Sequence, residues 1–310
     1  MNRQAFFTSI VSTALPLLSL LFIPTLSALA GSELEPLSNA SNETAVSSAA
    51  TNNRWGLFGA LDQRSEYGAG VFPEPFLVDD SDLEVNEFRV DILDTRSGSQ
   101  HADLFKTEVE KGFGPVTLEL ELLYERDVSA SVVSAGVNSI NPGARMPIYQ
   151  YVSDTVDTTV GVGAEVALPM GTTRSMNTEV VPKIFDDLKL GDHFTLQSIF
   201  GYSTMFGPGP DRNAQHFESG FVFGYTIQHD ELPIPGVQQI IPVFELLGDT
   251  AINKEAAGRT SLLGDIGFRT NLKAIGRVQP RLGVAFVFPL NDLARQDQHW
   301  GAITSLVFEF

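Results

Sequence analysis

The chain has 310 residues, a formal net charge of −18 and no cysteine. Such an acidic chain has no bulk attraction for nucleic acid or an anionic surface, and the lack of cysteine excludes disulfide frameworks and cysteine-ligated metal sites. The one long apolar run lies at the amino terminus, which excludes a helical protein with several membrane spans.

The first 30 residues have the organisation of a secretory signal peptide. Arg3 supplies a positive charge, an apolar run extends to Leu26, and Ala28 and Ala30 form a small-x-small cleavage site. We therefore expect residues 1–30 to be removed on export, with an uncleaved anchor helix as the alternative. Residues 31–53 are rich in Ser, Asn, Ala and Glu without periodicity, which predicts a disordered leader.

Residues 54–83 mix aromatic residues, glycine and proline without the period of a strand. Phe72, Pro73, Pro75 and Phe76 are too apolar for a solvated linker, so we expect the rest of the chain to bury them. The candidate plug residues are Trp55, Phe72 and Phe76. If the rest forms a barrel, this segment is a short plug in the lumen or a lid on the periplasmic mouth. A periplasmic flap without a fixed packing partner is the alternative.

From Leu83 onward, apolar and polar residues alternate with period two in one stretch after another. Because successive side chains of a strand point to opposite faces, this pattern predicts about twelve strands of membrane-spanning length. An even number of such strands is typical of an antiparallel, up-and-down transmembrane β-barrel, here formed by residues 84–310. The expected strands cover residues 87–92, 105–110, 116–125, 148–153, 156–168, 180–188, 194–202, 216–227, 239–248, 262–269, 277–288 and 299–310.

The connections between these strands also alternate. Those after even-numbered strands are short, except for the proline-rich residues 229–237, and those after odd-numbered strands are long or polar. Long loops outside and tight turns in the periplasm are the pattern of outer-membrane barrels, and an even strand count leaves both termini periplasmic. We expect residues 126–147, which contain Arg145, either to fold inward as a constriction or to lie outside. The long connections are residues 95–102, 126–147, 170–178, 206–214, 250–258 and 291–298.

The last twelve residues form the clearest of the expected strands. One face carries Gly, Ile, Ser, Val and Glu, and the other is apolar with aromatic residues at both ends. A terminal Phe310 preceded by Phe308 and Leu306 resembles the C-terminal signal of bacterial outer-membrane barrels, which their assembly machinery recognises. The apolar face consists of Trp300, Ala302, Thr304, Leu306, Phe308 and Phe310.

The chain also resembles a broad bacterial family of outer-membrane transporters named for a MetA-type phenol-degradation pathway. Residues 161–171, G-V-G-A-E-V-A-L-P-M-G, are similar to that family's glycine-rich strand ending in Leu-Pro-x-Gly. Residues 101–122 look like its early hairpin. The resemblance implies a barrel that passes small molecules, aromatic ones among them, and it carries over no catalytic motif.

In a barrel, the polar faces of the strands line the lumen. Acids lead in the first half and bases cluster late, and closure brings the last strands beside the first. The late arginines could then face the early acids across the pore, giving a transverse field that orients a solute. The alternative is a plugged, salt-bridged interior that only stabilises a narrow barrel. The candidate lining residues are Glu87, Arg89, Asp91, Glu108, Glu119, Glu121, Glu218, Arg277 and Arg281.

The sequence offers no pattern for catalysis. None of the five histidines lies at metal-ligand spacing, and there is no G-x-S-x-G motif. We therefore expect no catalytic residues, no metal and no cofactor. The expected protein is an outer-membrane channel for small molecules, weakly cation-selective, whose partners are lipid, the barrel assembly machinery and the solute. A barrel hydrolase and a closed structural or adhesion barrel are the alternatives.

Overall fold

The computed structural model describes residues 72–81, 86–129, 132–151, 153, 155–170, 177–276 and 278–310. The expected signal peptide, the expected leader, Trp55 and Arg277 lie outside these residues. The elements are β1 (Asn86–Ser97), β2 (Gln100–Phe113), β3 (Val116–Ser129), β4 (Val132–Tyr151), β5 (Val156–Pro169), β6 (Thr178–Leu190), β7 (Phe194–Phe206), β8 (Gln215–Tyr225), β9 (Ile227–Gln228), β10 (Val237–Ala251), β11 (Thr260–Leu272), β12 (Gln279–Pro289), α2 (Asp292–Asp297) and β13 (Trp300–Glu309).

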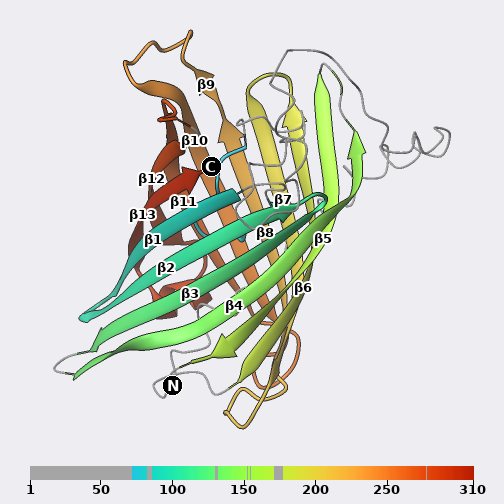
Figure 1. The fold of residues 1–310 in the computed structure, drawn as a ribbon. Helices are drawn as coiled ribbons and strands as arrows, with labels where there is room; N and C mark the ends of the chain where they lie inside the picture. Colours follow the sequence, from blue (N-terminus) through green and yellow to red (C-terminus); the bar gives the residue numbers. More distant parts are fainter. Residues whose placement is uncertain are drawn as a thin grey trace.

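Twelve long strands close into one antiparallel barrel (Figure 1). The sheet closes where β1 pairs with β13, in a register that runs from Glu87 opposite Glu309 to Arg96 opposite Trp300. The short β9 continues β8 beside β10 after an interruption at Thr226. The all-β antiparallel barrel of about twelve strands that the sequence predicts is confirmed, with β9 as one extra strand.

The barrel has two distinct ends. At one of them the N–H of Phe310 donates to the carbonyl of Asn86 over 2.9 Å, and this end carries the connections after β2, β4, β6, β9 and β11. We call it the turn end, marked by the label C in Figure 1, and the opposite one the loop end. The helix α2 lies at the loop end, where the Asn291 side chain caps it by accepting from the N–H of Ala294 over 2.9 Å. Among the described residues, no helix is long and apolar enough to cross a membrane.

The outer surface of the barrel is apolar. Along β13 the side chains alternate strictly, with the expected apolar face outward and the Gly, Ile, Ser, Val and Glu face buried. The same alternation leaves Phe223 42% exposed and Phe286 49% exposed, while their strand neighbours Val222 and Val287 are fully buried. Aromatic side chains contact one another on this outer surface, as Phe286 does with Trp300 at 6.3 Å between ring centroids. A sheet with such an exterior suits a lipid environment, because closure leaves no unpaired edge.

Two of the predicted long connections are wrong. The first is residues 126–147, because residues 132–151 form the 20-residue strand β4. The inward face of β4 carries polar Ser139, Asn141 and Arg145, all buried, and Pro142 lies on its exposed face. The polar inward residues of this stretch do alternate with apolar outward ones, but Asn141-Pro142-Gly143 is a typical turn sequence, so it favours a loop when the sequence is considered alone.

The second is the connection between β1 and β2, which is a tight turn and not the predicted loop over residues 95–102. Only Gly98 and Ser99 separate the two strands, and Gly98 adopts a φ of 59°, which favours glycine. The neighbouring residues are polar because they pair with one another across the hairpin, for example Arg96 opposite His101. The expected alternation of long and short connections is therefore wrong at both of these places.

The interior is divided into two zones along the barrel axis. Near the loop end, inward residues such as Leu93, Leu263 and Ile303 are apolar and at most 5% exposed. Toward the turn end, the inward positions of the same and neighbouring strands carry charged residues, among them Arg89 and Arg281. A charged layer inside a barrel requires partners for its charges, and these partners define the candidate site.

Candidate pore lining and the segment in the lumen

Residues 72–81 lie inside the barrel, against the inward faces of the strands. Phe72, Phe76 and Val78 are 3%, 6% and 5% exposed, and Phe76 and Val78 pack with inward apolar residues of the barrel. We call residues 72–81 the lumen segment. The remainder of the predicted plug, residues 54–71 and 82–83, lies outside the described residues, so the full plug stays a prediction.

Glycines in the strands make room for the lumen segment. A Cβ atom added to Gly220 on β8 would overlap a methyl carbon of Val78, and one added to Gly283 on β12 would lie 2.7 Å from the Phe76 ring. Real Cβ atoms do not approach other atoms so closely, so a larger residue at these positions would force the segment to shift, together with Ile199 beside Gly220 and Arg269 beside Gly283. Glycine within a strand often marks such a close approach.

The carboxylate of Glu245 on β10 holds the backbone of the lumen segment. Its Oε1 accepts from the N–H of Phe76 over 2.6 Å, and its Oε2 accepts from the N–H groups of Leu77 and Val78 over 2.8 and 2.9 Å. Glu245 is fully buried. Three consecutive N–H groups around one anion form charge-assisted hydrogen bonds, which are stronger than bonds between neutral groups.

Three arginines hold the carbonyl and carboxylate oxygens of the same segment. The carbonyl of Pro75 accepts from Arg89 on β1 and, over 2.5 Å, from Arg269 on β11. Arg269 also donates to the carbonyl of Glu74 over 2.7 Å, and its guanidinium lies 3.9 Å from the centre of the Phe76 ring. Arg281 on β12 pairs with the Glu74 carboxylate and, over 2.6 Å, with Glu309 on β13.

The opposite side of the segment is attached to β4, β6 and β7. Gln197 donates to the carbonyl of Pro73 over 2.7 Å, and the hydroxyl of Ser81 donates to Asp187 over 2.6 Å. The remaining contacts are ion pairs, of Lys183 with Asp79 and of Arg145 with Asp80, the latter at 3.8 Å. The lumen segment is therefore fixed to strands on both sides of the barrel.

The eight described members of the predicted lining set all face inward, and Arg277 lies outside the described residues. Most of their ion pairs are with residues on the same strand or an adjacent one. Arg89 pairs with Asp91 at 2.7 Å, and Lys106 bridges Glu108 and Glu121 at 2.8 Å each. Arg281 pairs with the lumen segment and β13 in place of the early acids expected across the pore. The set consists of Glu87, Arg89, Asp91, Glu108, Glu119, Glu121, Glu218 and Arg281.

Sequence reasoning missed several residues that organise this interior. Arg145, expected in a loop, is an inward residue of β4 that pairs with Glu110 and Glu119 at 2.5 Å each. Glu245 lies within an expected strand, but nothing in the sequence indicates that its carboxylate binds a backbone 168 residues away. The signal that could have found Arg145 is its spacing from Asn141, which places both on one face of a strand.

A cavity of about 220 Å³ lies beside the lumen segment. One part of its wall is apolar, built from the inward leucines near the loop end with Ile303 and Phe76. The other part is charged. The charged and amide side chains of the wall are Asp79, Asp91, Lys106, Glu121, Asn141, Glu165, Glu179, Lys183 and Glu218.

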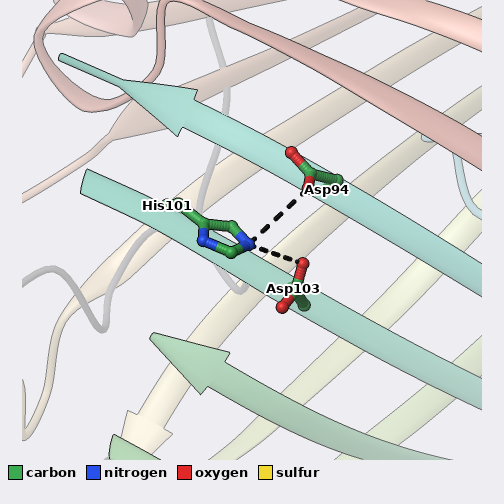
Figure 2. Close-up of side chains that lie close together, drawn as sticks. All are labelled: Asp94, His101 and Asp103. Carbon is green, nitrogen blue, oxygen red and sulfur yellow. Dashed lines mark hydrogen bonds and ion pairs between the residues drawn. The ribbon is translucent and has the colours of Figure 1, made fainter. Parts of the chain in front are cut away.

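Three groups of acidic side chains or histidine bring potential metal-ligating atoms within 4.8 Å of one another in the described residues. Figure 2 shows one of them, at the loop end, where His101 lies between Asp94 and Asp103 with its Nε2 2.9 Å from an Asp103 oxygen. Arg96 donates to both oxygens of Asp94, and Arg126 donates to Asp103 over 2.9 Å. Because arginines already neutralise both aspartates, this group is an ion-pair cluster at the rim. The other two groups are Glu74, Asp80 and Glu87, and Glu108, Glu110 and Glu119.

No known family model matches the sequence, and no curated protein matches it either. The resemblance to the phenol-degradation transporters therefore stays a prediction. Among solved structures, the fold is similar to the COG4313 outer membrane channel from Pseudomonas putida F1, with 11% sequence identity and a TM-score of 0.49 over 75% of this chain and 100% of that one. It is also similar to the NanC porin, with 10% identity and a TM-score of 0.45 over 73% of this chain and 98% of that one. The likeness to the KdgM porin has 13% identity and a TM-score of 0.38 over 72% of this chain and 99% of that one. At these identities and scores the likeness concerns the barrel architecture alone.

Proposed function

We propose that this protein is a bacterial outer-membrane channel for small molecules, narrowed by the lumen segment. The observation that carries the proposal is a closed barrel with an apolar exterior and a charged interior in which residues 72–81 are bound. The apolar exterior suits lipid, and a charged interior admits polar groups that lipid excludes. Small molecules can pass through such a barrel when the lumen segment moves, or through the space beside the segment, of which the cavity is a part.

The finer part of the proposal concerns the solute. The cavity combines an apolar wall with a charged one, which suits molecules that have an apolar body and a polar end. This feature agrees with the resemblance of residues 101–122 and 161–171 to the transporters named for phenol degradation. We include aromatic solutes in the proposal for both reasons.

The test is conductance of the purified full chain in planar bilayers, with a matched variant that lacks residues 54–83. We expect small conductance from the full chain and larger conductance after deletion, with preference for cations in a salt gradient. The preference should vanish in about 1 M salt, where the Debye length is about 3 Å. If neither protein conducts, the barrel is closed and a structural or adhesion role replaces the channel.

A further inference from the structure

We propose that the cavity beside the lumen segment is a binding site for an organic ammonium ion with an apolar body. The inference rests on the proposed function, because it names the class of solute that the channel holds. It is drawn from the acidic side chains of the cavity wall, from the carboxylate of Glu218 and from the apolar part of the wall.

The cavity wall carries more negative than positive charge. Six acidic side chains and two lysines line it, and one of the acids, Asp91, is paired with Arg89 at 2.7 Å, so acidic groups outnumber the basic groups that neutralise them. Both lysines are already engaged in ion pairs with two carboxylates each. Glu218, in contrast, makes no hydrogen bond and no ion pair within 4.0 Å among the described residues. Its carboxylate lies over Gly201, where an added Cβ would come within 3.1 Å of Oε2.

The rest of the wall selects an apolar body. Leu93, Leu263 and Ile303 are buried there, and further inward leucines complete the apolar part. The volume of about 220 Å³ is below the range of about 300–1,000 Å³ for drug-sized ligands, which indicates a ligand with one ring or a short chain. An ammonium group offers up to three N–H donors and a positive charge, while a carboxylate or phosphate would be repelled.

The experiment uses the purified full chain in detergent and isothermal titration with three probes of similar shape: phenethylammonium, 2-phenylethanol and 3-phenylpropionate. We expect phenethylammonium to bind at least about tenfold more tightly than the neutral alcohol, and the anion not to bind, since a hydrogen bond to a charged group is worth roughly that factor. Glu218→Gln should weaken phenethylammonium about tenfold and leave the alcohol unchanged. Glu125→Gln is the matched control, because Glu125 on β3 is a buried acid that does not line the cavity.

Equal affinity for the ammonium and the alcohol, no binding of either, or an equal loss in both variants would overturn the inference. Full competition by potassium ions at equal concentration would also overturn it, since the site would then take any cation. Uptake of phenethylammonium into proteoliposomes separates the two proposals. Binding without uptake rejects the channel function and leaves the site, whereas conductance without binding rejects the site and leaves the channel.

Discussion

The replacement of Glu245 by glutamine tests how the lumen segment is held. Glutamine keeps the size of the side chain but has one acceptor oxygen and no charge. With that oxygen in the place of Oε2, the N–H groups of Leu77 and Val78 keep weaker, neutral bonds, and the N–H of Phe76 faces an amide nitrogen. The change therefore removes one charge-assisted bond and weakens two.

The magnitude follows from these three bonds. A bond to a charged acceptor contributes about 1.5–3 kcal/mol and a neutral one about 0.5–1.5 kcal/mol, so the loss is about 4 kcal/mol. The neutral amide is less costly to bury than a carboxylate, which offsets roughly half of that loss. About 2 kcal/mol remains, and this raises the undocked population of the segment about 30-fold.

The assay is labelling of a single thiol. The chain contains no cysteine, so Val78→Cys places one reporter in the lumen segment, where Val78 is 5% exposed. When docking is fast, the rate of reaction with a small water-soluble thiol reagent follows the undocked population, so Glu245→Gln should raise the rate about 30-fold. Asp249→Asn is the control, because Asp249 is a buried acid on the same strand whose carboxylate bonds to His216. An unchanged rate, or equal acceleration in both variants, would refute the role assigned to Glu245.

Three further outcomes are expected. Gly220→Ala should expose the lumen segment to a protease because its Cβ would overlap Val78, and Val78→Ala should restore protection; failure of this rescue would contradict the packing. Ile266 lies at the middle of β11 and is 58% exposed, so Ile266→Lys should destabilise the barrel in bilayers by about 2–4 kcal/mol in urea titrations. Leu290→Lys at the loop end should cost only about 0–1 kcal/mol, and equal effects of the two variants would show that the lipid-facing band is assigned wrongly. Deletion of Phe310 removes one side chain, worth at most about 3 kcal/mol, so folding into detergent should survive while assembly in cells fails; equal surface levels of both proteins would reject a role in recognition.

The fold could be predicted wherever one face of a strand is apolar and the other is not. The alternation of β13, or of β8 around Phe221 and Phe223, follows from lipid on one side and a charged or small lining on the other. β4 was missed although Asn141 and Arg145 alternate with apolar outward residues, because Asn141-Pro142-Gly143 is a typical turn sequence. A period-two pattern is therefore obscured where proline and glycine inside the strand resemble a turn.

The candidate site could be predicted only as a list of inward residues. Alternation places Arg89 and Arg281 in the lumen, and both lie there. Their partners depend on where residues 72–81 run, because Glu74 and the carbonyl of Pro75 bind them. The path of residues 72–81 through the barrel is set by side chains that lie 14 to 207 residues away in the sequence, so no local sequence pattern predicts it.

The bonds of Pro75 have a consequence for the order of folding. Its carbonyl joins Arg89 on β1 to Arg269 on β11, and the neighbouring Glu74 reaches Arg281 on β12, so the lumen segment spans the seam where the first and last strands meet. The contacts with Arg269 and Arg281, which lie 194 and 207 residues away in the sequence, form late because the chain between them must be ordered first. The segment cannot reach its final position before the last strands are inserted. Once there, it binds the first strand and the last strands at the same time. These contacts favour the closed sheet over open intermediates with exposed edges.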